Sequence, residues 1–539
     1  MVKICLGCTR KPYIVEVDIP SAAISMAKMP GTLKSNYDKL MVKAKELTIL
    51  QTIESIVHWD METKMPPKAI NLRSQQLAML SQIEHRKSTA PEIETLLSRI
   101  EKHQDYQSLN ELQKRNVYLI RKFYDEQTKL PEELVVETAK QQAITIDVWK
   151  KAKAAKDFSM FKPELEKLLE LRKKAASILM QVKATKTPYD ALIDIFEPRM
   201  TAGMIDQVFG ELRKGLVSIL NRCLSAPKQP DTSFLKRRVP LDVQCKISNE
   251  LVRFIGYDVE SPKAGGRIDE TEHPFTTGYY DDVRITTHYY EDNIASSLFS
   301  VLHEGGHAIY EQNLKPEWIY QPVGTGCSLG FHESQSRFVE NIVGRSREFW
   351  IYFFPKLKEL TGNTFSDVAL DDFVRAINRV RPSKIRVEAD EVTYCLHVII
   401  RFEIERELIA DKITVADLPE VWNQKYKECL GLDIENDSEG VMQDIHWASG
   451  YFGYFPTYAL GNIYSGQLLV MLEKAMPNWR GQIAKGNFHD VKKWLTENVH
   501  YYGNLYDPTV LIKKITSEQI NVKPYFEYLN KKYSWIYEY

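Results

Sequence analysis

The segment His303-Glu304-Gly305-Gly306-His307 holds the residue types of a metal-dependent hydrolase. On a helix, two histidines four residues apart project from the same face, so both imidazoles can bind one ion. The glutamate between them can accept a proton from a water that the ion activates. Each glycine weakens a helix interior by about 1 kcal/mol relative to alanine, which indicates that another chain element or a substrate comes close. The motif predicts a zinc site with Glu304 as its general base.

A catalytic zinc ion needs a third protein ligand and an open position. A second helical pattern begins at Phe331–Arg337 and offers His332 and Glu333. Adjacent helical residues point about 100° apart, so we expect only one of the two to reach the ion. Spacing alone does not choose between them. Glu340, seven residues after Glu333 on roughly the same face, is a candidate partner for the second nitrogen of a ligating histidine.

The elements that position these residues can be read from local patterns. Asp281–Thr287 alternates polar and apolar residues with period two, which predicts a short strand. Asp292 or Asn293 can cap a following helix from Ile294 to about Gln312, and this helix carries the HExxH motif.

The rest of the chain is predicted to be mainly helical. Successive helices are expected from about Tyr37 to Ala226, one of them announced by the capping-box spacing of Ser108 and Glu111. We expect an irregular connection at Lys228–Gly266 and a glycine- and aromatic-rich break at Gly450–Gly461. The predicted fold class is therefore mainly α, with a small β-sheet next to the HExxH helix.

Composition excludes several classes of protein. The 539 residues include 71 basic and 72 acidic side chains, so there is no overall attraction to nucleic acid or to an anionic membrane. No apolar run approaches 18 residues, and the first 20 residues lack the apolar core of a secretory signal. We expect a cytoplasmic protein whose seven cysteines are reduced, with Cys5 and Cys8 in a loose tail rather than in a metal or redox site.

Six motifs occur in a fixed order along the chain. They are HPF at His273–Phe275, DxRxT at Asp282–Thr286, HExxH at His303–His307, HES followed by QSR at His332–Arg337, IRxxAD at Ile385–Asp390 and GxxQDxHW at Gly440–Trp447. In this order they resemble the M32 family of zinc carboxypeptidases, the thermostable carboxypeptidase Taq type. The resemblance covers roughly residues 37–539. Two features depart from it: residues 1–36 match nothing in the family, and Arg199 stands where glycine is expected.

The resemblance implies a single helical unit over residues 37–539 with a deep active-site groove, preceded by a poorly ordered N-terminal extension, residues 1–36. It implies homodimers, and zinc or cobalt held by His303, His307 and Glu333. The implied reaction removes single residues from the carboxy terminus of peptides, with broad side-chain preference.

Further site residues are predicted from the chemistry of such a reaction. A tetrahedral oxyanion needs a hydrogen-bond donor, for which His446, Tyr454 and Tyr458 are candidates. His273, directly before a proline, is a candidate to contact the substrate or frame the site.

An exopeptidase must also recognise a free carboxylate, which suits the planar fork of arginine. Arg386 is the first choice, with Arg284 and Arg337 in reserve. The structural alternative is an internal ion pair between Arg386 and Asp390, one helical turn later.

Two other functions share some of these features. A zinc endopeptidase or oligopeptidase of the related helical groove type would use the same HExxH chemistry. A non-catalytic helical scaffold that binds peptides is the third reading, but it has no need of Glu304.

Overall fold

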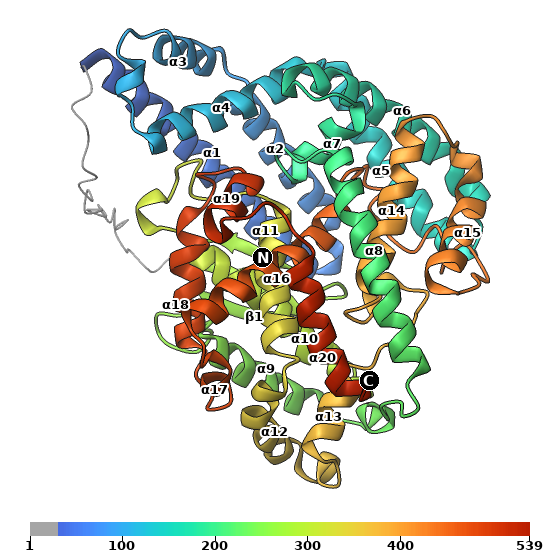
Figure 1. Cartoon of the computed structure of the whole chain (residues 1–539). Coiled ribbons are helices and arrows are strands. Elements are labelled where there is room, and N and C mark those ends of the chain that lie inside the picture. The colour runs from blue at the N-terminus through green and yellow to red at the C-terminus, as the bar shows by residue number, and fades with distance from the viewer. Residues whose placement is uncertain (1–30) are drawn as a thin grey trace, which may run out of the picture.

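The computed structural model describes residues 31–539, so Cys5 and Cys8 and most of the expected N-terminal extension lie outside the described residues. Within this range the chain is mainly helical and contains one three-stranded sheet, which confirms the predicted fold class (Figure 1). Helix α1 begins at Gly31, six residues before the expected start of the helical unit. None of the described helices is both long and apolar enough to cross a membrane.

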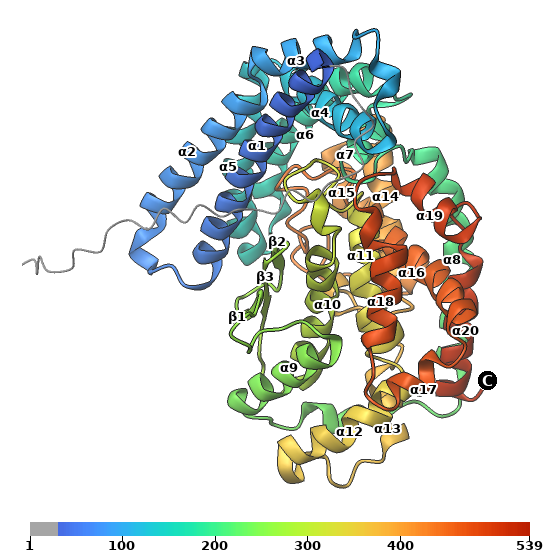
Figure 2. The ribbon, with the colours of Figure 1, turned by 90° about the vertical axis from the view of Figure 1, so that its left-hand side faces the viewer.

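The first eight helices form the N-terminal part of the described chain, and α1–α6 lie across one end of the molecule (Figure 2). Helices α1, α3 and α4 share a small apolar core that is separate from the main one. The capping box of α4 is formed by Asn110 and Gln113, so the predicted pair Ser108 and Glu111 is wrong by two residues. The bounds are α1 Gly31–Thr63, α2 Ile70–Ser88, α3 Pro91–Glu101, α4 Glu111–Lys129, α5 Glu132–Ala155, α6 Phe158–Lys183, α7 Pro188–Phe196 and α8 Ala202–Ser225.

The segment expected to be an irregular connection contains helix α9, Leu241–Ile255. Its apolar residues Ile247, Leu251 and Ile255 recur at four-residue spacing and are buried, a helical pattern that the flanking prolines and glycines obscured. The sheet follows, with strands β1 Gly266–Glu270, β2 Thr276–Tyr279 and β3 Asp282–Thr287 in the order β1-β3-β2. The predicted strand at β3 is confirmed.

Strand β3 is the centre of the sheet. It pairs in parallel with β1 and antiparallel with β2, which leaves β2 as an edge strand next to α10. Helix α10, Ile294–Gln312, has the predicted bounds, although Asn293 occupies the N-cap position without a side-chain capping bond.

Helix α11, Leu329–Arg337, is packed between α10 and the long helix α16, Pro456–Ala475 (Figure 2). A π-helical turn, Phe338–Val343, extends α11. The other helices surround this centre, with bounds α12 Arg347–Thr361, α13 Leu370–Ile377, α14 Tyr394–Ile409, α15 Leu418–Leu430, α17 Trp479–Ile483, α18 His489–Asn498, α19 Pro508–Thr516 and α20 Lys523–Tyr537.

Candidate active site

Two glycines allow α11 to lie unusually close to its neighbours. A Cβ atom on Gly306 of α10 would be 2.6 Å from Cα of Ser336, and a Cβ atom on Gly461 of α16 would be 2.6 Å from Cγ of Glu333. Both separations are far shorter than the 3.5–4.0 Å of an ordinary carbon–carbon contact. The close approach predicted by the glycines of the HExxH motif is to α11 at Gly306 and to Ile255 of α9 at Gly305.

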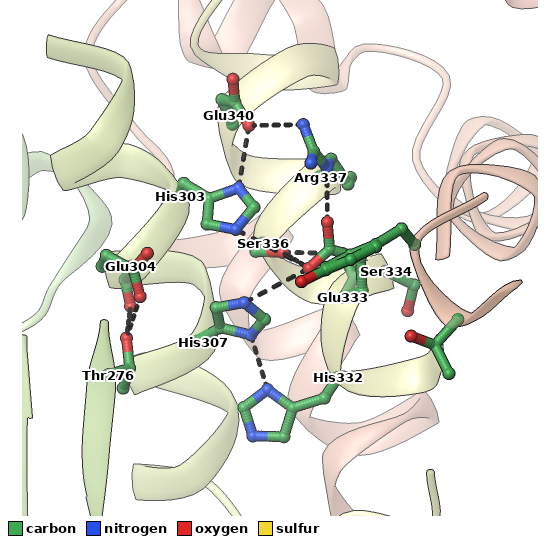
Figure 3. A network of polar contacts seen from close by, with 12 residues as sticks. Thr276, His303, Glu304, His307, His332, Glu333, Ser334, Ser336, Arg337 and Glu340 are labelled. Carbon is green, nitrogen blue, oxygen red and sulfur yellow. Dashed lines mark hydrogen bonds and ion pairs between the residues drawn. The ribbon is translucent and has the colours of Figure 1, made fainter. Parts of the chain in front are cut away.

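Helices α10 and α11 bring together the three predicted ligands, as Figure 3 shows. Nε2 of His303 lies 3.7 Å and Nε2 of His307 lies 3.5 Å from Oε2 of Glu333. One ligand atom from each residue lies within 4.8 Å of the other two. Two ligands of one tetrahedral zinc ion are about 3.4 Å apart, since each lies about 2.1 Å from the metal. Two imidazoles and one carboxylate at this spacing fit a divalent ion.

Charged neighbours set the ionisation of these groups. Burial opposes the charge on Glu333, but Arg337 and His303 outweigh it and hold the pKa of this carboxyl well below its usual range. Burial lowers the pKa of His307 to about 3, so its ring is neutral. A carboxylate and a neutral imidazole are the forms that bind metal.

Behind the ligands, Glu340 joins the two helices electrostatically (Figure 3). Its carboxylate accepts a hydrogen bond of 2.9 Å from Nδ1 of His303, as the sequence predicted. Arg337 donates to both Glu333, at 2.6 Å, and Glu340, at 3.2 Å. Glu340 lies within the π-helical turn, whose wider spacing alters its direction relative to Glu333, and such turns are frequent at functional sites.

His332 lies on the far side of His307 from Glu333. Its Nδ1 is 2.5 Å from Nδ1 of His307, and its Nε2 is 2.7 Å from Oε1 of Glu311. The structure thus brings Glu333, and not His332, to the Nε2 atoms of both HExxH histidines.

Glu304 lies on a face of α10 adjacent to that of His303 and His307, and its carboxylate is directed toward Thr276 of the sheet (Figure 3). Its Oε2 accepts a hydrogen bond of 2.6 Å from the hydroxyl of Thr276 on the edge strand β2. Burial raises the pKa of Glu304 above its usual range. A carboxyl with a raised pKa and a fixed orientation suits proton transfer near neutral pH.

Arg386 forms an internal ion pair, but not with the partner that spacing suggested. Its Nε and Nη2 donate to Oδ1 of Asp444 at 3.0 and 2.9 Å, and its Nη1 donates to Tyr394 at 3.1 Å. Asp390 instead accepts from the backbone N–H groups of Val392 and Thr393. The predicted Arg386–Asp390 pair is therefore wrong, because Arg386–Glu388 is a short 3₁₀ turn and Asp390 does not follow on the same α-helical face.

The two alternative candidates for carboxylate binding, Arg284 and Arg337, also form ion pairs within the protein. Arg284 donates to Asp282 on its own strand and stacks on Trp59, with 4.3 Å from its guanidinium carbon to the ring centre. Arg337 makes the carboxylate contacts described above and stacks on Tyr394 at 4.1 Å.

His446, Tyr454 and Tyr458 form one cluster at the start of α16. Nε2 of His446 lies 3.1 Å from the hydroxyl of Tyr458, and the rings of Tyr454 and Tyr458 are 5.4 Å apart. Burial and the nearby charge of Glu333 raise the pKa of Tyr454 to about 12, so its hydroxyl keeps its proton. Burial lowers the pKa of His446 to about 3. Both groups are therefore neutral, and Tyr454 lies near Glu333 of the ligand cluster.

His273 is the most peripheral of the predicted residues. It is exposed in the loop between β1 and β2, two residues before Phe275, which pairs with β3 through Thr286. The structure does not bring its side chain into the ligand cluster.

Sequence reasoning missed Glu197, which is fully buried and holds the start of α11. Its carboxylate accepts from the hydroxyls of Ser328 and Tyr464 and from the backbone N–H of Gly330, at 3.1, 2.9 and 3.0 Å. An acidic side chain next to a proline gave no signal for this role. The missed Thr276 and Glu311 are ordinary polar residues in sequence, and only the fold brings them to the site.

Arg199, where the family resemblance predicts glycine, has a φ of +66°. This left-handed conformation favours glycine, which explains the expectation. The Arg199 backbone N–H donates to Asp194 at 2.7 Å, and its guanidinium donates to Tyr118 at 3.0 Å, so the departure lies outside the ligand cluster.

Comparisons with known proteins agree over nearly the whole chain. Residues 39–533 match the Carboxypeptidase Taq (M32) metallopeptidase family. Carboxypeptidase 1 of Bacillus subtilis (strain 168) is 40% identical over 488 residues, which is 90% of this chain and 95% of the relative. Thermostable carboxypeptidase 1 of Thermus thermophilus is 39% identical over 94% of this chain and 100% of the relative. The crystal structure of an M32 carboxypeptidase from Deinococcus radiodurans R1 superimposes with a TM-score of 0.90 at 36% identity, covering 94% of this chain and 100% of that one. The chain therefore belongs to the M32 family of metallocarboxypeptidases and is a peptide hydrolase.

Proposed function

We propose that the protein is a zinc-dependent carboxypeptidase that releases single residues from the free carboxy terminus of peptides, with broad side-chain preference. The observation that carries this proposal is that one ligand atom from each of His303, His307 and Glu333 lies within 4.8 Å of the others. Glu304 lies on α10 together with the two histidines. Two imidazoles and one carboxylate are a common donor set of catalytic zinc, and cobalt suits the same donors.

When bound, the ion supplies Lewis-acid polarisation of the scissile carbonyl and lowers the pKa of the attacking water. Glu304 accepts a proton from that water and passes it to the departing amine nitrogen. Thr276 holds the carboxylate through its 2.6 Å hydrogen bond, so Glu304 does not need to be ordered at the moment of reaction.

The tetrahedral oxyanion needs further donors, and we assign these to the cluster at the start of α16. Tyr454 and His446 are neutral donors in a buried setting, where a hydrogen bond to a developing charge is strong. Nδ1 of His446 is buried, 4.0 Å from Oδ1 of Asp444, and has no hydrogen-bond partner among the described residues. Tyr458 bonds to Nε2 of His446 and keeps its ring in place.

Arg386 is our candidate for recognition of the terminal carboxylate. Its guanidinium has five N–H donors, of which Asp444 and Tyr394 take three, so two remain for a bidentate contact. The guanidinium lies 4.9 Å from the ring centre of Tyr458, which connects it to the proposed oxyanion donors. We assign His273, in the loop between β1 and β2, a contact with the substrate outside the ligand cluster.

The proposal is tested by mass spectrometry of one peptide in two forms, with a free and with an amidated carboxy terminus, combined with metal analysis. Stepwise loss of single residues from the free form alone, with one zinc ion per chain, is the expected result. Internal cleavage of both forms would contradict it and would indicate the endopeptidase alternative.

Glu304→Gln is the matched variant for this test. The amide removes the base but no ligand, so we expect one zinc ion per chain and a loss of turnover of at least about 100-fold. Zinc loss together with activity loss would contradict the assignment of Glu304 as base.

A cytoplasmic location and a homodimeric assembly stay predictions from the sequence and the resemblance. Sedimentation of the purified chain measures the second directly.

A further inference from the structure

A line of three side chains leads away from the ligand cluster through His307. Nδ1 of His307 meets Nδ1 of His332 at 2.5 Å, and Nε2 of His332 meets the Glu311 carboxylate at 2.7 Å (Figure 3 shows the first contact). All three side chains are more than three-quarters buried, with 16%, 20% and 18% exposed for His307, His332 and Glu311. None of these contacts belongs to the ligand set itself.

Counting protons along this line fixes the tautomer of each ring. A carboxylate only accepts hydrogen bonds, so Nε2 of His332 must carry a hydrogen and donate to Glu311. In a neutral imidazole the other nitrogen, Nδ1, is then an acceptor. Two ring nitrogens at 2.5 Å must share one hydrogen, which therefore belongs to Nδ1 of His307. The Nε2 atom of His307 is left with a free lone pair, and this atom faces Glu333.

The two HExxH histidines are oriented by different means. His303 is held directly by a carboxylate, Glu340, which is itself contacted by Arg337 and Arg345. His307 is held by the imidazole of His332, with the Glu311 carboxylate behind it. Partners of this kind fix the ring orientation and the basicity of a metal ligand.

The fold supplies the line from both helices that build the site. His307 and Glu311 are four residues apart on α10 and share one face, whereas His332 comes from α11. The loop before α11 contacts the His332 ring, since a Cβ atom on Gly326 would be 3.4 Å from its Cδ2, an ordinary contact distance. His332 can therefore bridge Glu311 and His307 without a change in either helix.

We propose that His332 and Glu311 are positioning residues that hold His307 in the tautomer and orientation that bind the metal ion. This inference rests on the proposed metal site at His303, His307 and Glu333. It gives a function to the histidine that competes with Glu333 in the sequence: His332 acts on the ion through His307.

The test is a measurement of the zinc dissociation constant by competition with a chromophoric chelator, on the purified full-length chain. We expect His332→Leu and Glu311→Ala to weaken zinc binding about 10- to 100-fold, with one ion still bound at saturation. Glu311→Gln keeps an acceptor oxygen for His332 and should lose less. The double variant His332→Leu/Glu311→Ala should bind zinc no more weakly than His332→Leu, because Glu311 acts only through His332.

Two controls separate this role from a merely structural one. Glu317→Ala removes an exposed acidic residue just beyond α10 and should leave zinc affinity unchanged. A structural tie between α10 and α11 would lower the melting temperature of the metal-free variants while the zinc dissociation constant stays at the wild-type value, and that result overturns the proposal.

The variant His303→Ala distinguishes an error in the proposed role of His332 and Glu311 from an error in the proposed metal site. If this variant binds zinc as the wild type does, the ion lies elsewhere, and the proposed function and the inference fall together. If His303→Ala loses zinc but folded Glu311→Ala and His332→Leu bind it normally, only the inference falls.

Discussion

Replacing Gly306 by alanine tests whether α10 and α11 must touch through their backbones for the site to form. The added Cβ atom would be 2.6 Å from Cα of Ser336 and 2.7 Å from the carbonyl oxygen of Gln335. Both are backbone atoms of α11, so no side-chain rotation can relieve the overlap. To reach an ordinary contact, the two helices must separate by about 1 Å.

The expected effect on activity is larger than the effect on stability. Overpacking of this kind costs about 1–3 kcal/mol, and alanine returns about 1 kcal/mol of helix propensity, so the net loss of stability is about 0–2 kcal/mol. Glu333 moves with α11, however, and a displacement of about 1 Å at a catalytic site can cost about 100-fold in rate. We therefore expect kcat/KM of Gly306→Ala to fall about 100-fold in a folded protein.

Gly305→Ala is the matched control, one residue away in the same motif. Its Cβ atom would meet only the Ile255 side chain, 2.4 Å from the terminal Cδ1, and this methyl group can move whereas the backbone of α11 cannot. We expect its kcat/KM to stay within a few-fold of wild type. Equal kcat/KM values for the two variants, measured with one free-ended peptide at saturating zinc and alongside their melting temperatures, would refute the reasoning.

Three further predictions concern single side chains. Arg386→Ala should lower kcat/KM for free-ended peptides at least about 30-fold and reduce the ratio of kcat/KM between free and amidated peptides. A lower melting temperature with an unchanged ratio would mean that the arginine only supports Asp444. Thr276→Val removes the hydrogen bond to Glu304 and should lower kcat about 10-fold or more with little change in KM. Thr276→Ser keeps the hydroxyl and should keep most of the activity. Equal kcat values for the two variants would contradict this role of Thr276. Burial raises the pKa of Glu197 to about 7, above the roughly 4.3 of an unfolded glutamate. The folded state therefore binds the proton of Glu197 more tightly than the unfolded state does. The resulting contribution to the free energy of unfolding is fully present below about pH 4.3 and is lost as the pH rises to about 7. The free energy of unfolding of Glu197→Gln, measured with denaturant at pH 5 and pH 7, should decline less over this interval than that of the wild type.

Arg386 shows where reasoning from spacing fails. A partner four residues away is expected only on an α-helix, but Arg386–Glu388 forms a 3₁₀ turn. The partner is Asp444, far along the chain, which also accepts from Arg401 at 2.7 Å. Asp390 binds backbone N–H groups at the start of α14 instead. Neither contact has a local sequence signal.

The predictions for helix α9 and for the capping residues of α4 were wrong for a different reason. Both helices follow from apolar periodicity, but residues typical of turns and caps near their ends led to a wrong assignment. Prolines and glycines around α9 suggested a connection, although Ile247, Leu251 and Ile255 form a buried helical face. Boundaries are the least certain part of any local pattern, since they depend on backbone conformation at single residues.

The sequence by itself determined which local elements carry the residues of the HExxH motif. The period of 3.6 residues places His303 and His307 on one helical face, and the alternation at Asp282–Thr287 predicts strand β3, because both patterns are local. The tertiary structure decided which side chains complete the site. Glu333 and His332 are neighbours in sequence with equal claims, and only the packing of α11 between Gly306 and Gly461 turns Glu333 toward both histidines and His332 behind one of them. The partners of Glu304, His307 and Arg386 come from separate elements, and a single sequence carries no record of the distances between them.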